Sequence, residues 1–195
     1  MPRFVIDQSS VSEHRIVVAA LGDSITEGSP GLRGWDVWAA RADARYEIRN
    51  CGIYGQRTDE IAARLDECAR GADVLVVQGG INDIAQGRDV GTAAANLRAM
   101  VRRGGELVSR VLLADVLAWN NGWPDAEPRI RKLNDLIAQI ARDEQVPLLR
   151  FHDALEDGER PGRMREEWTF EGDHPNEAGY RLLADVVLSV LRSDR

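Results

Sequence analysis

The chain has 195 residues, and 44% of them are hydrophobic, which is enough to bury the core of one domain. Its formal net charge is −7, whereas general nucleic-acid binders carry a basic stripe that neutralises phosphates. Basic runs do not exceed two residues, as at Arg102 and Arg103. These properties exclude a general nucleic-acid binder and predict one compact domain.

The sequence also bears on membranes and on redox environment. No apolar run approaches transmembrane length, and residues 1–13 lack the apolar centre of a signal peptide. Cys51 and Cys68 match no zinc or redox spacing, so we expect two ordinary thiols in a reducing compartment. The chain therefore reads as a cytoplasmic protein without a membrane span, and nothing in it defines an oligomeric state.

Short aliphatic runs alternate along the chain with segments of helical periodicity. The runs predict five strands, at Arg15–Leu21, Tyr46–Cys51, Asp73–Gln78, Arg110–Val116 and Val146–Phe151. The periodic segments predict helices at Trp35–Arg41, Thr58–Arg70, Gly91–Arg103, Pro128–Glu144 and Asn176–Leu191, with Thr58 and Asn176 suited to cap theirs. This alternation predicts a parallel sheet covered on both faces, in one domain at 15–195 that follows an N-terminal extension at 1–14.

In open α/β sheets, functional residues gather at the carboxyl ends of the strands. Four of the segments that follow predicted strands are rich in Gly, Asn and Asp: Gly22–Gly28, Gly52–Gln56, Gly79–Asp83 and Trp119–Pro124. Ser24 lies in the first, and His174 lies about 150 positions later in a turn sequence, Asp173-His174-Pro175. A serine after a strand and a distant histidine in a turn are typical of a nucleophile and its general base, which predicts a serine hydrolase.

Four separated blocks resemble, in order, those of the GDSL or SGNH hydrolases, a family of esterases, lipases and acyl transferases. The blocks are Gly22-Asp23-Ser24, Gly55 within Tyr54–Thr58, Gly80-Ile81-Asn82-Asp83, and His174 within Asp173–Asn176 followed by Gly179-Tyr180. The resemblance runs from about Ile16 to Leu191. It implies a three-layer α/β/α, flavodoxin-like fold with a five-stranded parallel sheet, and an esterase that acts on a small-molecule ester.

The resemblance also implies a role for each block. Ser24 would attack the ester carbonyl while His174 takes its proton, because a serine hydroxyl is a weak nucleophile at neutral pH. The backbone N–H groups of Ser24 and Gly55 and the side-chain amide of Asn82 would then stabilise the oxyanion. No cofactor and no metal is implied.

The family places an aspartate three residues before the histidine, and Glu171 occupies that position here. Glutamate serves as the triad acid in other serine hydrolases, so we expect Glu171 to orient His174. Two alternatives stay open. Asp173 could act instead, although side chains adjacent in sequence usually diverge, or no carboxylate contributes much.

The substrate is less defined than the chemistry. The chain is short of insertions, which favours an open cleft and a small acyl group, for example in the deacetylation of a sugar; acyl transfer and thioester hydrolysis use the same machinery. Trp119 and Trp123 are candidates for lining a pocket. The rival classes are a metal-dependent phosphoesterase, disfavoured because two of the three histidines lie outside any motif, and a binding module without catalysis.

Overall fold

A five-stranded parallel sheet forms the centre of the computed structural model, which describes residues 15–29 and 31–193. The strand order is β2-β1-β3-β4-β5, as in flavodoxin-like folds. The strands are β1 (Ile16–Gly22), β2 (Tyr46–Gly52), β3 (Val74–Val77), β4 (Arg110–Ala114) and β5 (Leu148–Leu149). The predicted fold class is thus confirmed. The expected extension at 1–14 lies outside the described residues.

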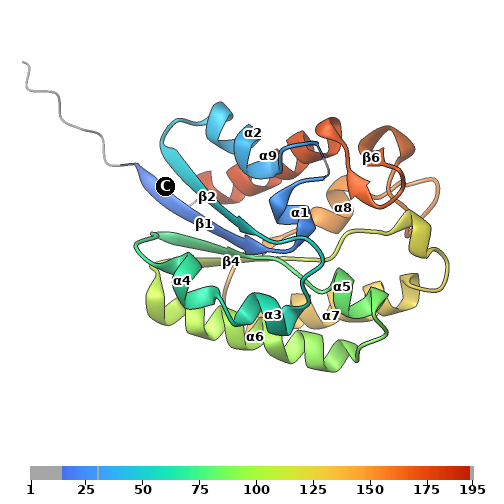
Figure 1. Cartoon of the computed structure of the whole chain (residues 1–195), viewed down its shortest axis with the longest axis horizontal. Coiled ribbons are helices and arrows are strands. Elements are labelled where there is room, and N and C mark those ends of the chain that lie inside the picture. The colour runs from blue at the N-terminus through green and yellow to red at the C-terminus, as the bar shows by residue number, and fades with distance from the viewer. Residues whose placement is uncertain (1–14, 30, 194–195) are drawn as a thin grey trace, which may run out of the picture.

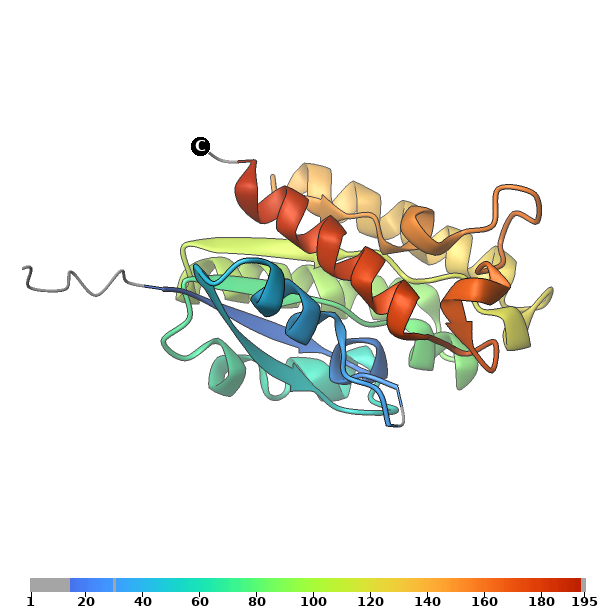
Figure 2. The same ribbon diagram turned by 90° about the horizontal axis from the view of Figure 1, so that it is seen from above.

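Helices cover both faces of the sheet (Figure 1). One layer contains α3 (Thr58–Ala62), α4 (Leu65–Ala69), α5 (Ile81–Ala85), α6 (Val90–Leu107) and α7 (Glu127–Asp143). The other contains α1 (Ser24–Glu27), α2 (Trp35–Ala42), α8 (Phe151–Leu155) and α9 (Glu177–Arg192). Figure 2 shows α9 running across the face of the sheet beside α2. The protein is therefore a three-layer α/β/α sandwich.

The alternation of side chains along β1 divides the core in two. Ala19 and Leu21 pack in the cluster beneath α6 and α7, whereas Val18 and Ala20 pack in the cluster beneath α2 and α9. All four are fully buried. A central parallel strand meets helices on both faces, which explains why its sequence is a continuous apolar run rather than an alternating one.

The helix expected over Thr58–Arg70 is two helices, α3 and α4. The chain leaves helical geometry at Arg64, where φ is −115° and ψ is 12°. Thr58 is the first residue of α3 rather than its cap, and its hydroxyl donates to Asp83. At α9 the expected cap is confirmed, because the Asn176 side chain accepts a hydrogen bond from the backbone of Gly179 at 3.1 Å.

Several short elements were not predicted from periodicity. They are the one-turn helices α1, α5 and α8, two 3₁₀ turns at Asn120–Gly122 and Glu166–Trp168, and a small antiparallel hairpin of β6 (Thr169–Phe170) and β7 (His174–Pro175). Elements of two to five residues are too short to show a repeat, so no hydrophobic pattern distinguishes them from loops.

The expectation of two free thiols is wrong, because Cys51 and Cys68 form a disulfide. The bond joins the end of β2 to α4. Disulfides persist mainly in oxidising compartments, so the cysteines no longer support the cytoplasmic prediction. Among the described helices, none combines the length and the apolarity that crossing a bilayer requires.

Replacing both cysteines should destabilise the protein. The bond closes a loop with a sequence separation of 17, and such a cross-link typically contributes about 3 kcal/mol by constraining the unfolded chain. We expect the free energy of unfolding in urea to fall by about that amount in a Cys51→Ser, Cys68→Ser double variant. Titration of thiols in the denatured, unreduced wild type is the control. Two reactive thiols there would contradict the disulfide.

Candidate active site

The first site segment is a tight turn from β1 into α1. Asp23 caps α1 by accepting a hydrogen bond from the backbone of Ile25 at 3.0 Å, and its own N–H donates to Gln78 Oε1 at 3.1 Å. A side chain on Gly22 would not fit, because its Cβ would lie 2.2 Å from Thr26 Oγ1. This turn places Ser24 at the carboxyl end of the sheet.

His174 comes to Ser24 on the small hairpin before α9. Its Nε2 lies 2.9 Å from Ser24 Oγ, although the two residues are 150 positions apart. The neighbouring backbone is held as well, because the Ser29 hydroxyl donates to the carbonyl of Pro175 at 2.9 Å. In this geometry the imidazole can accept the proton of the Ser24 hydroxyl.

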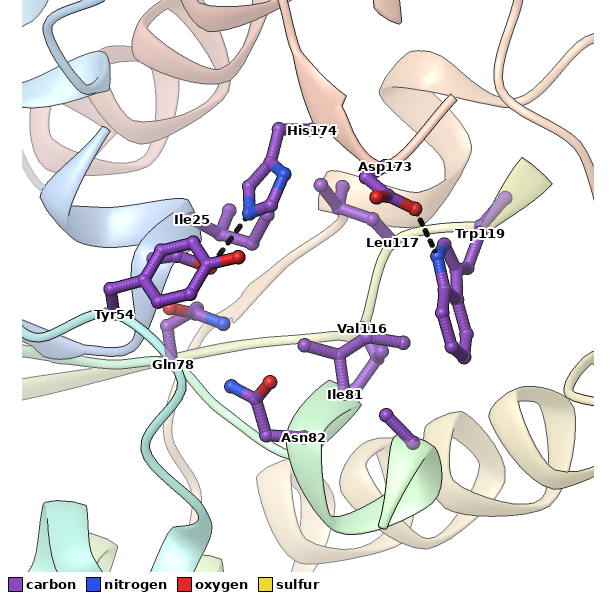
Figure 3. A pocket seen from close by; sticks show the side chains of 13 residues that line it. Ile25, Tyr54, Gln78, Ile81, Asn82, Val116, Leu117, Trp119, Asp173 and His174 are labelled. Carbon is purple, nitrogen blue, oxygen red and sulfur yellow. Dashed lines mark hydrogen bonds between the residues drawn. The ribbon is translucent and has the colours of Figure 1, made fainter. Parts of the chain in front are cut away.

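Tyr54 covers one side of the imidazole. Its ring stacks on that of His174 with centroids 5.8 Å apart and planes inclined by 22° (Figure 3). Burial lowers the pKa of His174 from its ordinary value of 6.5, and the field of Asp173 acts in the opposite direction. At neutral pH the imidazole is therefore mainly uncharged, which is the form a general base needs.

The structure does not bring the Glu171 carboxylate to the imidazole. Glu171 is exposed and has a positive φ of 52°, and no hydrogen bond joins its carboxylate to His174 within the described ranges. The Asp173 carboxylate lies in the site but faces away from His174, toward Trp119 (Figure 3). Its Oδ1 accepts from Trp119 Nε1 at 2.6 Å and from Asn121 Nδ2 at 2.8 Å. The orienting contact expected of Glu171 is thus not formed.

Asn82 and Gly55 lie on the segments that follow β3 and β2. Asn82, on α5, donates from Nδ2 to the carbonyl of Gln56 at 2.9 Å. An amide group carries two hydrogens, so this bond leaves one for another acceptor. Gly55 lies in the loop that joins β2 to α3, residues 53–57, which we call the β2–α3 loop. Its φ is +77°, a conformation that glycine adopts without strain.

Asp83 links the start of α3 to the segment after β3. It is buried, and its carboxylate accepts from the backbone N–H and the hydroxyl of Thr58 at 2.9 and 2.8 Å. Asp23 is also buried, which raises its pKa to about 6. Both aspartates therefore brace backbone beside the site, and among the hydrogen bonds of the described residues neither carboxylate bonds the Ser24 hydroxyl.

A cavity of about 130 Å³ opens beside Ser24, His174 and Asn82. Apolar side chains of Ile25, Ile81, Ala85, Val116, Leu117 and Trp119 form one part of its wall, and Tyr54, Gln78 and Asp173 add polar groups. Trp119 and Trp123 were both candidates for lining a pocket. Trp119 lines this cavity, and Trp123 is not among its lining residues. The cavity therefore offers both apolar surface and polar partners beside Ser24.

The sequence of the chain also matches a known protein family. The profile of the GDSL-like Lipase/Acylhydrolase family matches residues 20–182, a span that contains Ser24, Asn82 and His174. The chain belongs to this family. It is therefore a GDSL-like hydrolase that acts on ester bonds.

Solved structures show the same fold. A GDSL-family lipolytic protein from Veillonella parvula superposes with a TM-score of 0.80 at 22% identity, over 91% of this chain and 99% of that chain. An acetylxylan esterase from Geobacillus stearothermophilus gives a TM-score of 0.75 at 20% identity, over 93% and 97% of the two chains. No curated protein sequence matched this GDSL-like hydrolase.

Two residues of the site were missed in the sequence. Tyr54 and Gln78 both line the cavity. Tyr54 is 62% exposed although it is aromatic and lies within the second family block, and Gln78 is a polar residue directly after the apolar strand β3. A polar residue at the end of a buried strand, and an aromatic residue in a glycine-rich loop, were signals that could have identified them.

The pH dependence of this GDSL-like hydrolase should report which carboxylate acts on His174. We expect kcat/KM to fall on the acid side with an apparent pKa below 6.5, since burial favours the neutral imidazole. Asp173→Asn should move this limb to still lower pH, because the field of Asp173 raises the pKa of His174. Glu171→Gln should leave the limb unchanged. A shift of the acid limb in Glu171→Gln, with none in Asp173→Asn, would instead identify Glu171 as the acid partner of His174.

Proposed function

We propose that this enzyme hydrolyses carboxylic esters of small acyl groups through an acyl intermediate on Ser24. The observation that carries the proposal is the 2.9 Å contact between Ser24 Oγ and His174 Nε2 at the wall of the cavity. A serine hydroxyl in this contact can lose its proton to the imidazole as it attacks a carbonyl carbon.

In the first half of the reaction, Ser24 Oγ bonds to the acyl carbon while its proton passes to His174 Nε2. The carbonyl oxygen becomes an oxyanion, which the N–H groups of Ser24 and Gly55 and the amide of Asn82 stabilise. The bond to the alcohol oxygen then breaks. The alcohol leaves with the proton from His174, and the acyl group remains on Ser24.

In the second half, water replaces the alcohol. His174 removes a proton from water as the water oxygen attacks the acyl-serine, and the same donors stabilise the second oxyanion. The acid leaves, and the proton returns to Ser24. We propose that the imidazolium formed in each half is stabilised by the field of Asp173 rather than by a hydrogen bond from Glu171.

The size and lining of the cavity support a small acyl group. A volume of about 130 Å³, lined in part by Ile25, Ile81 and Val116, has room for a short acyl chain but not for a long one. The Tyr54 ring, 62% exposed at this site, offers a flat aromatic surface to the alcohol part of the ester. A sugar ring could stack on such a surface, which supports acetylated sugars as one substrate class.

Removing the nucleophile and one oxyanion donor tests the mechanism. Ser24→Ala should abolish hydrolysis of p-nitrophenyl acetate, and Asn82→Ala should lower kcat roughly a hundredfold, as the loss of one oxyanion donor does. Ser189→Ala is the matched control, because this exposed serine of α9 lies far along the helix from the site and its hydroxyl donates to the carbonyl of Val186. Mass spectrometry should locate a serine-directed phosphonate on Ser24. Hydrolysis that survives Ser24→Ala would exclude the mechanism.

A series of p-nitrophenyl esters tests the acyl preference. We expect kcat/KM to be highest for acetate or propionate and to decline with longer chains, because the cavity wall stops them. Ile81→Ala, which enlarges the cavity, should move the optimum toward longer chains. A wild-type preference for octanoate would contradict the small-acyl assignment.

A further inference from the structure

One guanidinium connects three segments that border the active site. Arg64 lies between α3 and α4, and its Nη2 donates to the carbonyl of Gly22 at 2.6 Å. Its Nε donates to Gln56 Oε1 at 2.7 Å, and its Nη1 donates to the carbonyl of Cys51. These acceptors lie at the end of β1, in the β2–α3 loop and near the end of β2.

Two of these contacts, those with Gly22 and Gln56, lead to the proposed oxyanion donors. Gly22 precedes Ser24 by two residues on the turn that sets the direction of the Ser24 N–H. Gln56 follows Gly55 directly, and its carbonyl accepts the hydrogen bond from Asn82 Nδ2 at 2.9 Å. Arg64 is therefore linked to all three donors without reaching the cavity itself, since it is not among the residues that line the cavity.

The chemistry of the contacts distinguishes Arg64 from a surface arginine. It is partly buried, and its three acceptors are neutral oxygen atoms. Burial lowers its pKa, while the fields of Asp23 and Glu27 act in the opposite direction, so the guanidinium remains charged. A planar group with donors in fixed directions can hold three acceptors at once, which a lysine ammonium does less well.

The backbone is also irregular at Arg64. The periodic pattern predicts one helix over Thr58–Arg70, yet the chain leaves helical geometry at Arg64, with φ at −115° and ψ at 12°. The break between α3 and α4 thus lies at a residue whose side chain joins three segments that border the site.

We propose that Arg64 is a positioning residue that sets the geometry of the oxyanion hole. The inference rests on the proposed function, because it assigns Arg64 to the donors that this function uses. Arg64 touches no substrate; it holds the Gly22 turn, the β2–α3 loop and, through Gln56, the amide of Asn82 in one arrangement. A shift of about 1 Å in such donors can lower turnover by roughly a hundredfold.

The test compares Arg64→Ala with Arg49→Ala. Arg49 is a matched control because it also bridges β2 and α4, donating to the carbonyls of Arg70 at 2.7 Å and Cys68 at 3.3 Å, but it reaches no site loop. We expect Arg64→Ala to lower kcat by roughly tenfold or more with little change in KM, and Arg49→Ala to leave both unchanged. In Arg64→Lys, kcat should fall nearly as far as in Arg64→Ala. The lysine keeps the positive charge but lacks the planar set of donors that holds three acceptors.

Two further measurements separate positioning from general destabilisation. The acid limb of kcat/KM should be the same in Arg64→Ala as in the wild type, because Arg64 does not contact His174. In an Asn82→Ala background, Arg64→Ala should lower kcat by a smaller factor than it does in the wild type. The effects of substituting residues that act as a unit are not additive. The proposal would be overturned if the factors by which Asn82→Ala and Arg64→Ala lower kcat simply multiply in the double variant. Equal kcat in Arg64→Ala and Arg49→Ala would also overturn it.

The outcomes also separate this proposal from the proposed function. If Ser24→Ala abolishes hydrolysis while Arg64→Ala keeps wild-type kcat, only the role of Arg64 fails. If Ser24→Ala keeps hydrolysis, the mechanism itself fails. Should Arg64→Ala not fold, Gln56→Ala replaces it, because it removes one acceptor of Arg64 and leaves the guanidinium in place. A kcat for Gln56→Ala equal to that of Arg49→Ala would then overturn the proposal.

Discussion

The 2.9 Å contact between Ser24 and His174 closes a loop of 150 residues, and the surrounding structure holds its two ends in place. On the serine side, the α1 turn is fixed by its own cap and by Gln78. On the histidine side, Tyr180 of α9 hydrogen-bonds the Ser29 hydroxyl at 3.2 Å, and Ser29 also holds Pro175. The first turn of α9 therefore couples His174 to the segment that carries Ser24.

The sheet brings the remaining site segments to the same edge. Because β1, β2 and β3 are parallel neighbours, their carboxyl ends lie together, and the loops that follow them meet. This much was predictable, since strand runs and periodic helices depend on patterns of burial that a sequence shows directly. The order of family blocks then indicated which loops to inspect, and Ser24, Asn82 and His174 do border one cavity.

The parts that were not predictable depend on contacts between distant segments. Glu171 occupies the family position of the acid, but a left-handed backbone at 171 and 172 leaves its carboxylate exposed. Asp173, adjacent to the histidine, is held by Trp119 from the loop after β4. The disulfide was missed for a similar reason, because a spacing of 17 residues does not reveal that the end of β2 lies next to Cys68 of α4. No local pattern encodes such pairings.

The disulfide has a consequence for local opening of the molecule. Residues 51–68 form a covalent ring that contains Gly55, Gln56 and Arg64. Short helices such as α3 and α4, with few turns of their own, are the kind of element that opens before the rest of a protein. When such an opening occurs here, both ends of the segment stay joined. The residues between them, Arg64 and its acceptors Cys51 and Gln56 included, therefore cannot separate as far as they would in an open chain.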